Sequence, residues 1–142
     1  MIRLPVSSRF VNDTGNDLLQ GKIHSLRKNY NYWKKFEGRE LALYSWAGKP
    51  YRSRQNVICV KPLVSVQKVR LWHNETVDGY KMWPEFFIKT GRHDPFPLKQ
   101  EELAANDGFE DGEEFTEWFY DYPDGVMAIL HFTNFKYGEK TE

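Results

Sequence analysis

Side chains capable of chemistry lie close together early in the chain, in the stretch Gly21-Lys22-Ile23-His24-Ser25-Leu26-Arg27. Lys22 could supply a cation or, where burial disfavours its ammonium form, a base. Ser25 could act as a nucleophile once a neighbouring base takes its proton. Arg27 could bind a phosphate through two parallel hydrogen bonds. These residue types together indicate either acyl-transfer chemistry or the binding of an anionic ligand.

The backbone around this stretch must bend if its side chains are to meet. A regular strand cannot bring Lys22 and Ser25 into one pocket, because successive side chains point to opposite faces. A bulge or a loop-to-strand transition between them could do so. We therefore expect a short helix at about 17–20 to end at Gly21, and the chain to continue as a strand over about 22–28.

A basic and aromatic segment follows, and it supplies further candidate ligand contacts. Lys28 could bind phosphate, while Tyr30 and Trp33 could stack on bases, as aromatic side chains do in single-strand binding. Trp46, which ends a predicted strand over 40–46, is a further candidate. The alternative is that Tyr30 and Trp33 lie on a short helix over 29–36 and bury area against a sheet.

The charge of the chain is divided between its two halves. Among the 142 residues the net charge is zero, but residues 1–71 hold 14 Lys and Arg against 4 Asp and Glu, a net charge of 14 − 4 = +10. Residues 72–142 hold 6 against 16, a net charge of 6 − 16 = −10. Such a division predicts either a basic ligand-binding face or halves that pair within one fold.

Pattern and length predict a single α+β domain over 1–142. We expect about six or seven short strands, with three or four short helices packed around them as a small curved sheet or barrel. Asp78-Gly79 predicts a hairpin turn. The region at about 72–97 is aromatic and acidic, and the tail from about 136 is polar and expected to fray. The predicted strands cover about 22–28, 40–46, 55–60, 63–72, 80–89 and 126–135, and the later helices begin near 100 and 111.

Several classes of protein are disfavoured by the residues present. The four histidines, His24, His73, His93 and His131, lack ligand spacing and Cys59 is the only cysteine, so we predict no metal site. A phosphate loop of the GxxxxGK type is absent, and we expect no cofactor. No apolar run approaches the roughly 20 residues of a membrane span, so no membrane partner is expected. The single cysteine, which reads as a core thiol, favours the cytoplasm.

The order of landmarks along the chain resembles the ASCH domain, a family of PUA-like β-barrels. The family opening has the form G-x-K-x-x-[ST]-x-R, although here Gly21 directly precedes Lys22. The likeness extends from about residue 17 to 135, with the region at about 72–97 as an elaboration. Its landmarks after the opening stretch are Asp107-Gly108-Phe109, then Glu113-Glu114-Phe115, and finally Ile129-Leu130-His131-Phe132.

The resemblance implies a PUA-like mixed β-barrel that binds RNA or a nucleoside or nucleotide ligand, with a pocket for a modified base. It also implies an alternative, since some members hydrolyse the amide of N4-acylated cytidines without a metal. By position the lysine, hydroxyl and carboxylate of those members fall on Lys22, Ser25 and Asp107, with serine and aspartate in place of threonine and glutamate. Lys22 would then take the proton of Ser25, while Asp107 orients the lysine or protonates the leaving amine.

A third hypothesis belongs to a different class of function. Exposed aromatic side chains could make the protein an interaction module that docks onto another protein. The candidate residues for that surface are Trp72, Tyr80, Trp83 and Phe86.

Overall fold

The structure is a computed structural model that describes residues 2–91 and 94–138. These residues form eight strands in two sheets, three α-helices and one short 3-10 helix, which confirms the predicted α+β class. The strands are β1 (Ile2–Pro5), β2 (His24–Lys28), β3 (Glu40–Trp46), β4 (Gln55–Pro62), β5 (Ser65–Glu75), β6 (Lys81–Ile88), β7 (Phe96–Pro97) and β8 (Gly125–His131). The helices are η1 (Ser8–Phe10), α1 (Tyr30–Lys34), α2 (Gln100–Asp107) and α3 (Gly112–Phe119).

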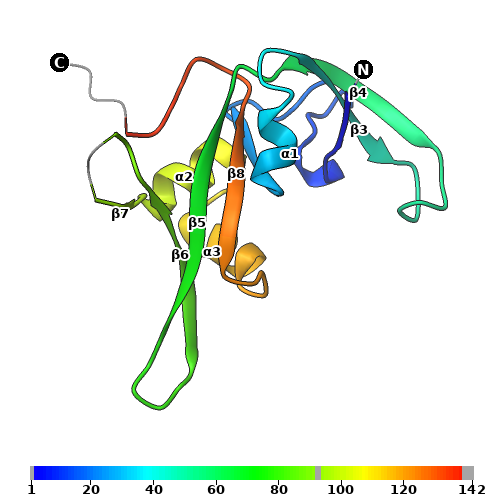
Figure 1. Cartoon of the computed structure of the whole chain (residues 1–142). Helices are drawn as coiled ribbons and strands as arrows, with labels where there is room; N and C mark the ends of the chain where they lie inside the picture. The colour runs from blue at the N-terminus through cyan, green and yellow to red at the C-terminus, as the bar shows by residue number, and fades with distance from the viewer. Residues whose placement is uncertain (1, 92–93, 139–142) are drawn as a thin grey trace.

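Two sheets form the framework of the molecule (Figure 1). The smaller has the order β1-β3-β4, with β1 parallel to β3 and β4 antiparallel to it. The larger has the order β2-β8-β5-β6-β7, and all of its pairs are antiparallel. The apolar strand β8 lies between β2 and β5, a central place that suits its largely apolar composition. Within the described residues no ladder joins the two sheets.

Helices cover the two faces of the larger sheet. Phe86 of β6 pairs with Leu71 and packs against the ring of Phe115 in α3. On β5, Lys68 has the opposite parity to Leu71, and its ammonium lies over the ring of Tyr30 in α1, 4.9 Å from the centroid. Because side chains alternate along a strand, α3 and α1 lie on opposite faces, so buried residues lie on both sides of the sheet.

Local signals account for several of the element ends. Gly79 has a φ of 82° in the turn that joins β5 to β6, which is the hairpin predicted at Asp78-Gly79. At the start of α3, Asp111 accepts a hydrogen bond from the backbone N–H of Glu114 at 2.8 Å, an N-cap contact. Pro62 ends β4, which is an edge strand, as a proline in a sheet requires. Among the described residues no helix has the length and apolar character needed to cross a membrane.

The helix predicted at about 17–20 is wrong. The segment from 12 to 22 forms turns, and Leu18 makes an isolated antiparallel bridge with Val11. The side-chain oxygen of Asn12 accepts from the backbone N–H groups of Asn16 and Asp17, each at 3.3 Å. Such local side-chain bonds offer the backbone an alternative to helix, and here they prevail.

The prediction that the tail frays from about residue 136 is also wrong for the first residues of that tail. Tyr137 is only 4 % exposed and joins the hydrophobic core. Its ring lies against Phe135, with the two ring centroids 4.9 Å apart. The part of the predicted tail at 139–142 lies outside the described residues.

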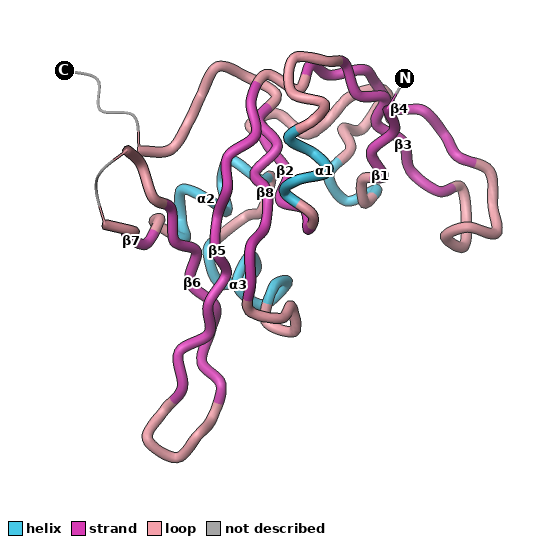
Figure 2. The backbone as a smooth tube through the Cα atoms, in the orientation of Figure 1, coloured by secondary structure: helices cyan, strands magenta, loops and turns pink. Residues whose placement is uncertain are grey.

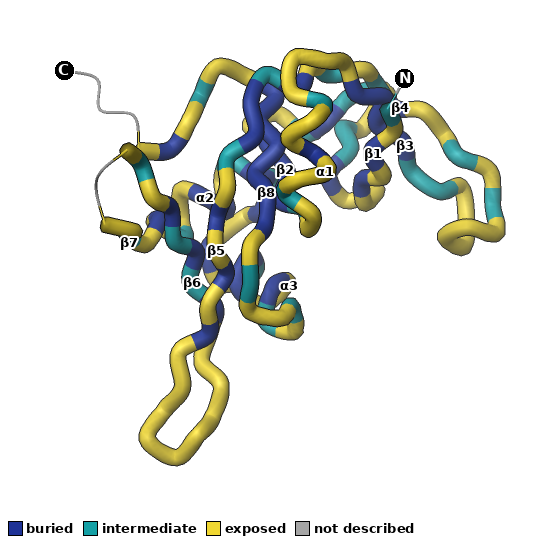
Figure 3. The backbone as a smooth tube through the Cα atoms, in the orientation of Figure 1, coloured by how far each residue is buried: buried dark blue, intermediate teal, exposed yellow. Residues whose placement is uncertain are grey.

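Two hairpins extend from the body of the molecule (Figures 1 and 2). The β5–β6 hairpin occupies most of the aromatic and acidic region predicted at 72–97, of which 92–93 lie outside the described residues. Trp72, Tyr80 and Trp83 are exposed there, as an interaction surface requires, and the tip of the hairpin is exposed throughout (Figure 3). Phe86 is fully buried, so its assignment to that surface is wrong.

Candidate functional site

Lys22 and Ser25 meet because the chain changes from loop to strand between them. Lys22 lies in the loop that precedes β2, and the strand begins at His24. The backbone N–H of Ile23 donates to the carbonyl of Asn106 at 2.8 Å, which holds this loop against the end of α2. The expected transition is therefore present, and Lys22 and Ser25 line one cavity.

The ammonium of Lys22 is buried among acceptors. Its Nζ donates to the carbonyl oxygens of His24 at 3.0 Å and Asp107 at 2.8 Å, and it lies 3.4 Å from Asp107 Oδ1. It also lies 4.5 Å from the ring centroid of Phe10, a cation–π contact. Three acceptors match the three N–H groups of an ammonium. Burial lowers the pKa of Lys22; the carboxylate of Asp107 opposes this shift, and the charge of Arg27 adds to it.

Asp107 stands at an unusual place for a carboxylate, the last residue of α2. The C-terminus of a helix carries partial negative charge, which favours cations and disfavours an acid. Lys22 compensates for this by contacting both the carbonyl and the carboxylate of Asp107. Gly108 makes the contact possible, since it has a φ of 91° and a Cβ there would lie 3.2 Å from both Lys22 Cβ and Phe10 Cδ1.

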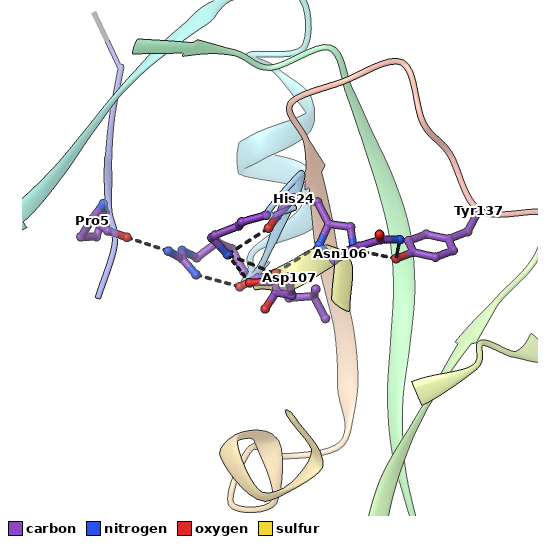
Figure 4. A network of polar contacts seen from close by, with 8 residues as sticks. Pro5, His24, Asn106, Asp107 and Tyr137 are labelled. Carbon is purple, nitrogen blue, oxygen red and sulfur yellow. Dashed lines mark hydrogen bonds and ion pairs between the residues drawn. The ribbon is translucent and has the colours of Figure 1, made fainter. Parts of the chain in front are cut away.

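A buried polar network continues from Asp107 (Figure 4). His24 Nδ1 lies 3.1 Å from Asp107 Oδ1, and His24 Nε2 lies 2.6 Å from the hydroxyl of Tyr137. Asn106 Nδ2 donates to the same hydroxyl at 2.9 Å. The sequence did not indicate Tyr137 or Asn106. The sequence did offer one indication that His24 belongs to the site, because strand alternation places its side chain on the same side as that of Lys22.

Lys22, Ser25, Arg27 and Asp107 line one cavity of about 90 Å³. Since a water molecule occupies about 30 Å³ in the liquid, this space alone matches about three waters. Ser25 Oγ is buried and has no hydrogen-bond partner among the described residues. Aromatic rings form much of the remaining wall. The lining residues are Val6, Ser7, Phe10, Lys22, Ser25, Leu26, Arg27, Asp107, Phe109, Trp118, Phe119 and Tyr122.

An open depression of about 350 Å³ adjoins this cavity and shares Leu26, Arg27 and Tyr122 with it. Its other lining residues are Lys28, Asn29 and Trp33. The guanidinium of Arg27 donates to the carbonyls of Leu26 at 3.0 Å and Pro5 at 2.6 Å (Figure 4). These bonds use two of the five N–H groups of arginine, so three remain for a ligand.

The structure brings some of the predicted site residues together and separates others. Lys28 and Trp33 line the open depression, where Trp33 is largely buried as part of the core. Tyr30 lines a different depression of about 400 Å³, which shares Asn29 with the open depression. Trp46 belongs to the β3–β4 hairpin, where its ring contacts Tyr44 and Tyr51, and it lines none of these three spaces. Its predicted role in ligand binding is therefore not supported.

Other residues with reactive side chains are held in structural contacts. His131 is fully buried, its Nε2 lies 2.7 Å from Gln67 Oε1, and burial lowers its pKa to about 3. Burial also raises the pKa of the Cys59 thiol, which makes it a weak nucleophile. No group of three or more metal-ligating side chains occurs among the described residues, which exclude His93.

Comparison with known proteins leaves this geometry as the basis for assigning a function. No family model matches the chain, and neither the curated proteins nor the solved structures contain a match.

Proposed function

We propose that the protein is a PUA-like ASCH domain that binds RNA or a nucleotide-like ligand through the cavity at Lys22. The observation that supports this most strongly is the hydroxyl of Ser25. A buried polar atom without a partner is costly, and here it lines a cavity together with Lys22, Arg27 and Asp107. Such a set offers donors from Arg27 and Ser25 and acceptors from Ser25 and Asp107 to the edge of a nucleobase, while the ammonium of Lys22 holds Asp107 in place.

The size of the site favours a nucleoside unit over a smaller ligand. Ligand pockets usually measure about 300–1,000 Å³, and the cavity reaches this range only together with the depression that shares Leu26, Arg27 and Tyr122. In our proposal only the polar edge of the base faces into the cavity, while the rest of the nucleoside and its phosphate lie in the open depression. Lys28 and the free N–H groups of Arg27 would bind the phosphate.

The contact between Arg27 and Pro5 supports a barrel-like arrangement of the two sheets. β1 is an edge of the smaller sheet and β2 is an edge of the larger one. Arg27 of β2 donates to the carbonyl of Pro5 in β1 at 2.6 Å. We propose that this side-chain bond takes the place of a backbone ladder in closing a PUA-like barrel, with the cavity beside the seam.

Arg27→Ala is expected to weaken the binding of a short single-stranded RNA by about 10- to 150-fold, because a charge-assisted hydrogen bond contributes about 1.5–3 kcal/mol. The slope of log affinity against log salt should fall by about 0.7, the value for one phosphate of a single strand. Fluorescence anisotropy at several salt concentrations measures both. Arg52→Ala, an exposed arginine in the β3–β4 turn, is the control. Equal affinities and slopes for the two variants would refute the proposed phosphate contact.

A second candidate function is the hydrolysis of N4-acylated cytidine, and the free hydroxyl of Ser25 favours it. For Lys22 to act as a base, its ammonium must first transfer a proton to Asp107, whose Oδ1 lies 3.4 Å away. The neutral amine would take the proton of Ser25 as Oγ bonds to the acyl carbon. The C–N bond would then break as the leaving nitrogen takes that proton, and water would release the acyl group from Ser25. Release of acetate from N4-acetylcytidine tests this activity.

A further inference from the structure

The polar network extends beyond the proposed site to the segment after β8. We infer that Tyr137 and His24 are positioning residues that together hold the carboxylate of Asp107 against Lys22. This inference rests on the proposed role of Lys22 and Asp107, and it adds a device for orienting their carboxylate.

The hydrogen-bond geometry assigns a direction to the network. Asn106 Nδ2 can only donate, so its 2.9 Å contact uses a lone pair of the Tyr137 oxygen. The hydroxyl hydrogen of Tyr137 is then free to point at His24 Nε2, 2.6 Å away. With Nε2 as an acceptor, a neutral His24 carries its proton on Nδ1 and donates it to Asp107 Oδ1 at 3.1 Å. In this arrangement each hydrogen-bonding atom named above has a partner.

The alternative charge state leaves one group without a partner. An imidazolium at His24 would donate from both nitrogens, and the Tyr137 oxygen would accept from His24 and Asn106 together. The hydroxyl hydrogen of the buried Tyr137 would then have no acceptor among these contacts. The neutral Nδ1–H form of His24 therefore fits its surroundings best.

Tyr137 is itself held in place by the larger sheet. The side-chain amide of Gln67 accepts from the backbone N–H of Tyr137 at 2.9 Å and donates to its carbonyl at 3.0 Å. This pair of bonds fixes the backbone of residue 137 in the way that a neighbouring strand would. A residue 113 positions away in sequence is thereby held against His24. Without the network, Asp107 Oδ1 would keep only its long contact with Lys22, and the carboxylate would be free to rotate.

Tyr137→Phe tests the inference, because it removes the hydroxyl and keeps the ring that packs in the core. Tyr51→Phe is the matched control, since Tyr51 is 88 % exposed. Nitrogen NMR of the ligand-free protein should show His24 protonated at Nδ1 and unprotonated at Nε2. In Tyr137→Phe we expect the Nε2 signal to move and the titration midpoint of Lys22 to fall, because its counter-ion is held less firmly. Tyr51→Phe should leave both unchanged.

Two results would overturn the inference. One is a wild-type His24 protonated at Nε2 at neutral pH, and the other is a Tyr137→Phe protein with unaltered His24 and Lys22 signals. Asn106→Ala removes the donor to the Tyr137 hydroxyl but keeps the backbone carbonyl that binds Ile23, and it should move the same signals. This variant replaces Tyr137→Phe as the test if the latter does not fold. Binding of N4-acetylcytidine should weaken about threefold or more in Tyr137→Phe. If the wild type does not bind this nucleoside, the proposed function fails, while the ligand-free spectra still decide the positioning role.

Discussion

Replacing Asp107 with alanine is expected to lower the free energy of unfolding by about 3–5 kcal/mol, the usual cost of removing one partner from a buried ion pair. The side chains of Lys22 and Asp107 are only 2 % and 6 % exposed. The variant would leave the ammonium of Lys22 among carbonyl groups without its counter-ion, and the Nδ1–H of His24 without an acceptor. Urea denaturation monitored by tryptophan fluorescence measures the loss.

A matched control and a second substitution test this explanation. Asp121→Ala removes an exposed carboxylate just after α3 and should change stability by less than about 0.5 kcal/mol. Adding Lys22→Met to Asp107→Ala removes the orphaned charge, so part of the lost stability should return. If Asp107→Ala lowers the free energy of unfolding no more than Asp121→Ala does, the buried ion pair does not stabilise the protein as predicted here.

Lys22→Met is expected to abolish detectable binding of a nucleoside, because it replaces the only ammonium in the cavity wall with an apolar group of similar length. Any hydrolysis of N4-acetylcytidine should fall by about 10²–10⁴, the contribution of a general base. Lys49→Met, which changes an exposed lysine in the β3–β4 turn, is the control and should keep wild-type behaviour. Isothermal titration calorimetry and an assay for released acetate give the two measurements.

Ser25→Ala separates the two candidate functions. Since Ser25 Oγ has no hydrogen-bond partner in the part of the chain that the structure describes, its removal should leave the free energy of unfolding nearly unchanged or slightly raised. A hydrolase that uses Ser25 as its nucleophile would lose turnover in this variant, whereas a binding protein would lose only part of its affinity. Wild-type turnover in Lys22→Met would exclude the lysine as the base, and wild-type turnover in Ser25→Ala would exclude the serine as the nucleophile.

Much of the framework follows from local patterns in the sequence. The alternation over 40–46 predicts the bounds of β3, and the turn at Asp78-Gly79 predicts the β5–β6 hairpin. These signals depend on residues close together in the chain, which is why they are reliable. The helix predicted at 17–20 fails for the same reason, because the side chain of Asn12 captures backbone N–H groups that a short helix would need.

Only part of the candidate site could be predicted from the sequence. The resemblance to the ASCH domain implied that Lys22, Ser25 and Asp107 share a site, and these residues line one cavity together with Arg27. The role of Tyr137 depends on the packing of the last described segment against β5, through contacts with Gln67 70 residues away. No local pattern predicts a contact at that distance, and the polar composition of the tail indicated fraying instead.

The most direct test of the central claim is a two-dimensional ¹H–¹⁵N NMR titration of the wild-type protein with N4-acetylcytidine. The proposal is that Lys22, Ser25, Arg27 and Asp107 surround a recess that accepts a nucleobase. It predicts saturable shifts concentrated at these residues and along the adjoining depression near Lys28. Absence of saturable shifts, or shifts confined to the β5–β6 hairpin around Tyr80, would contradict it, and the second pattern would favour a protein-docking surface there.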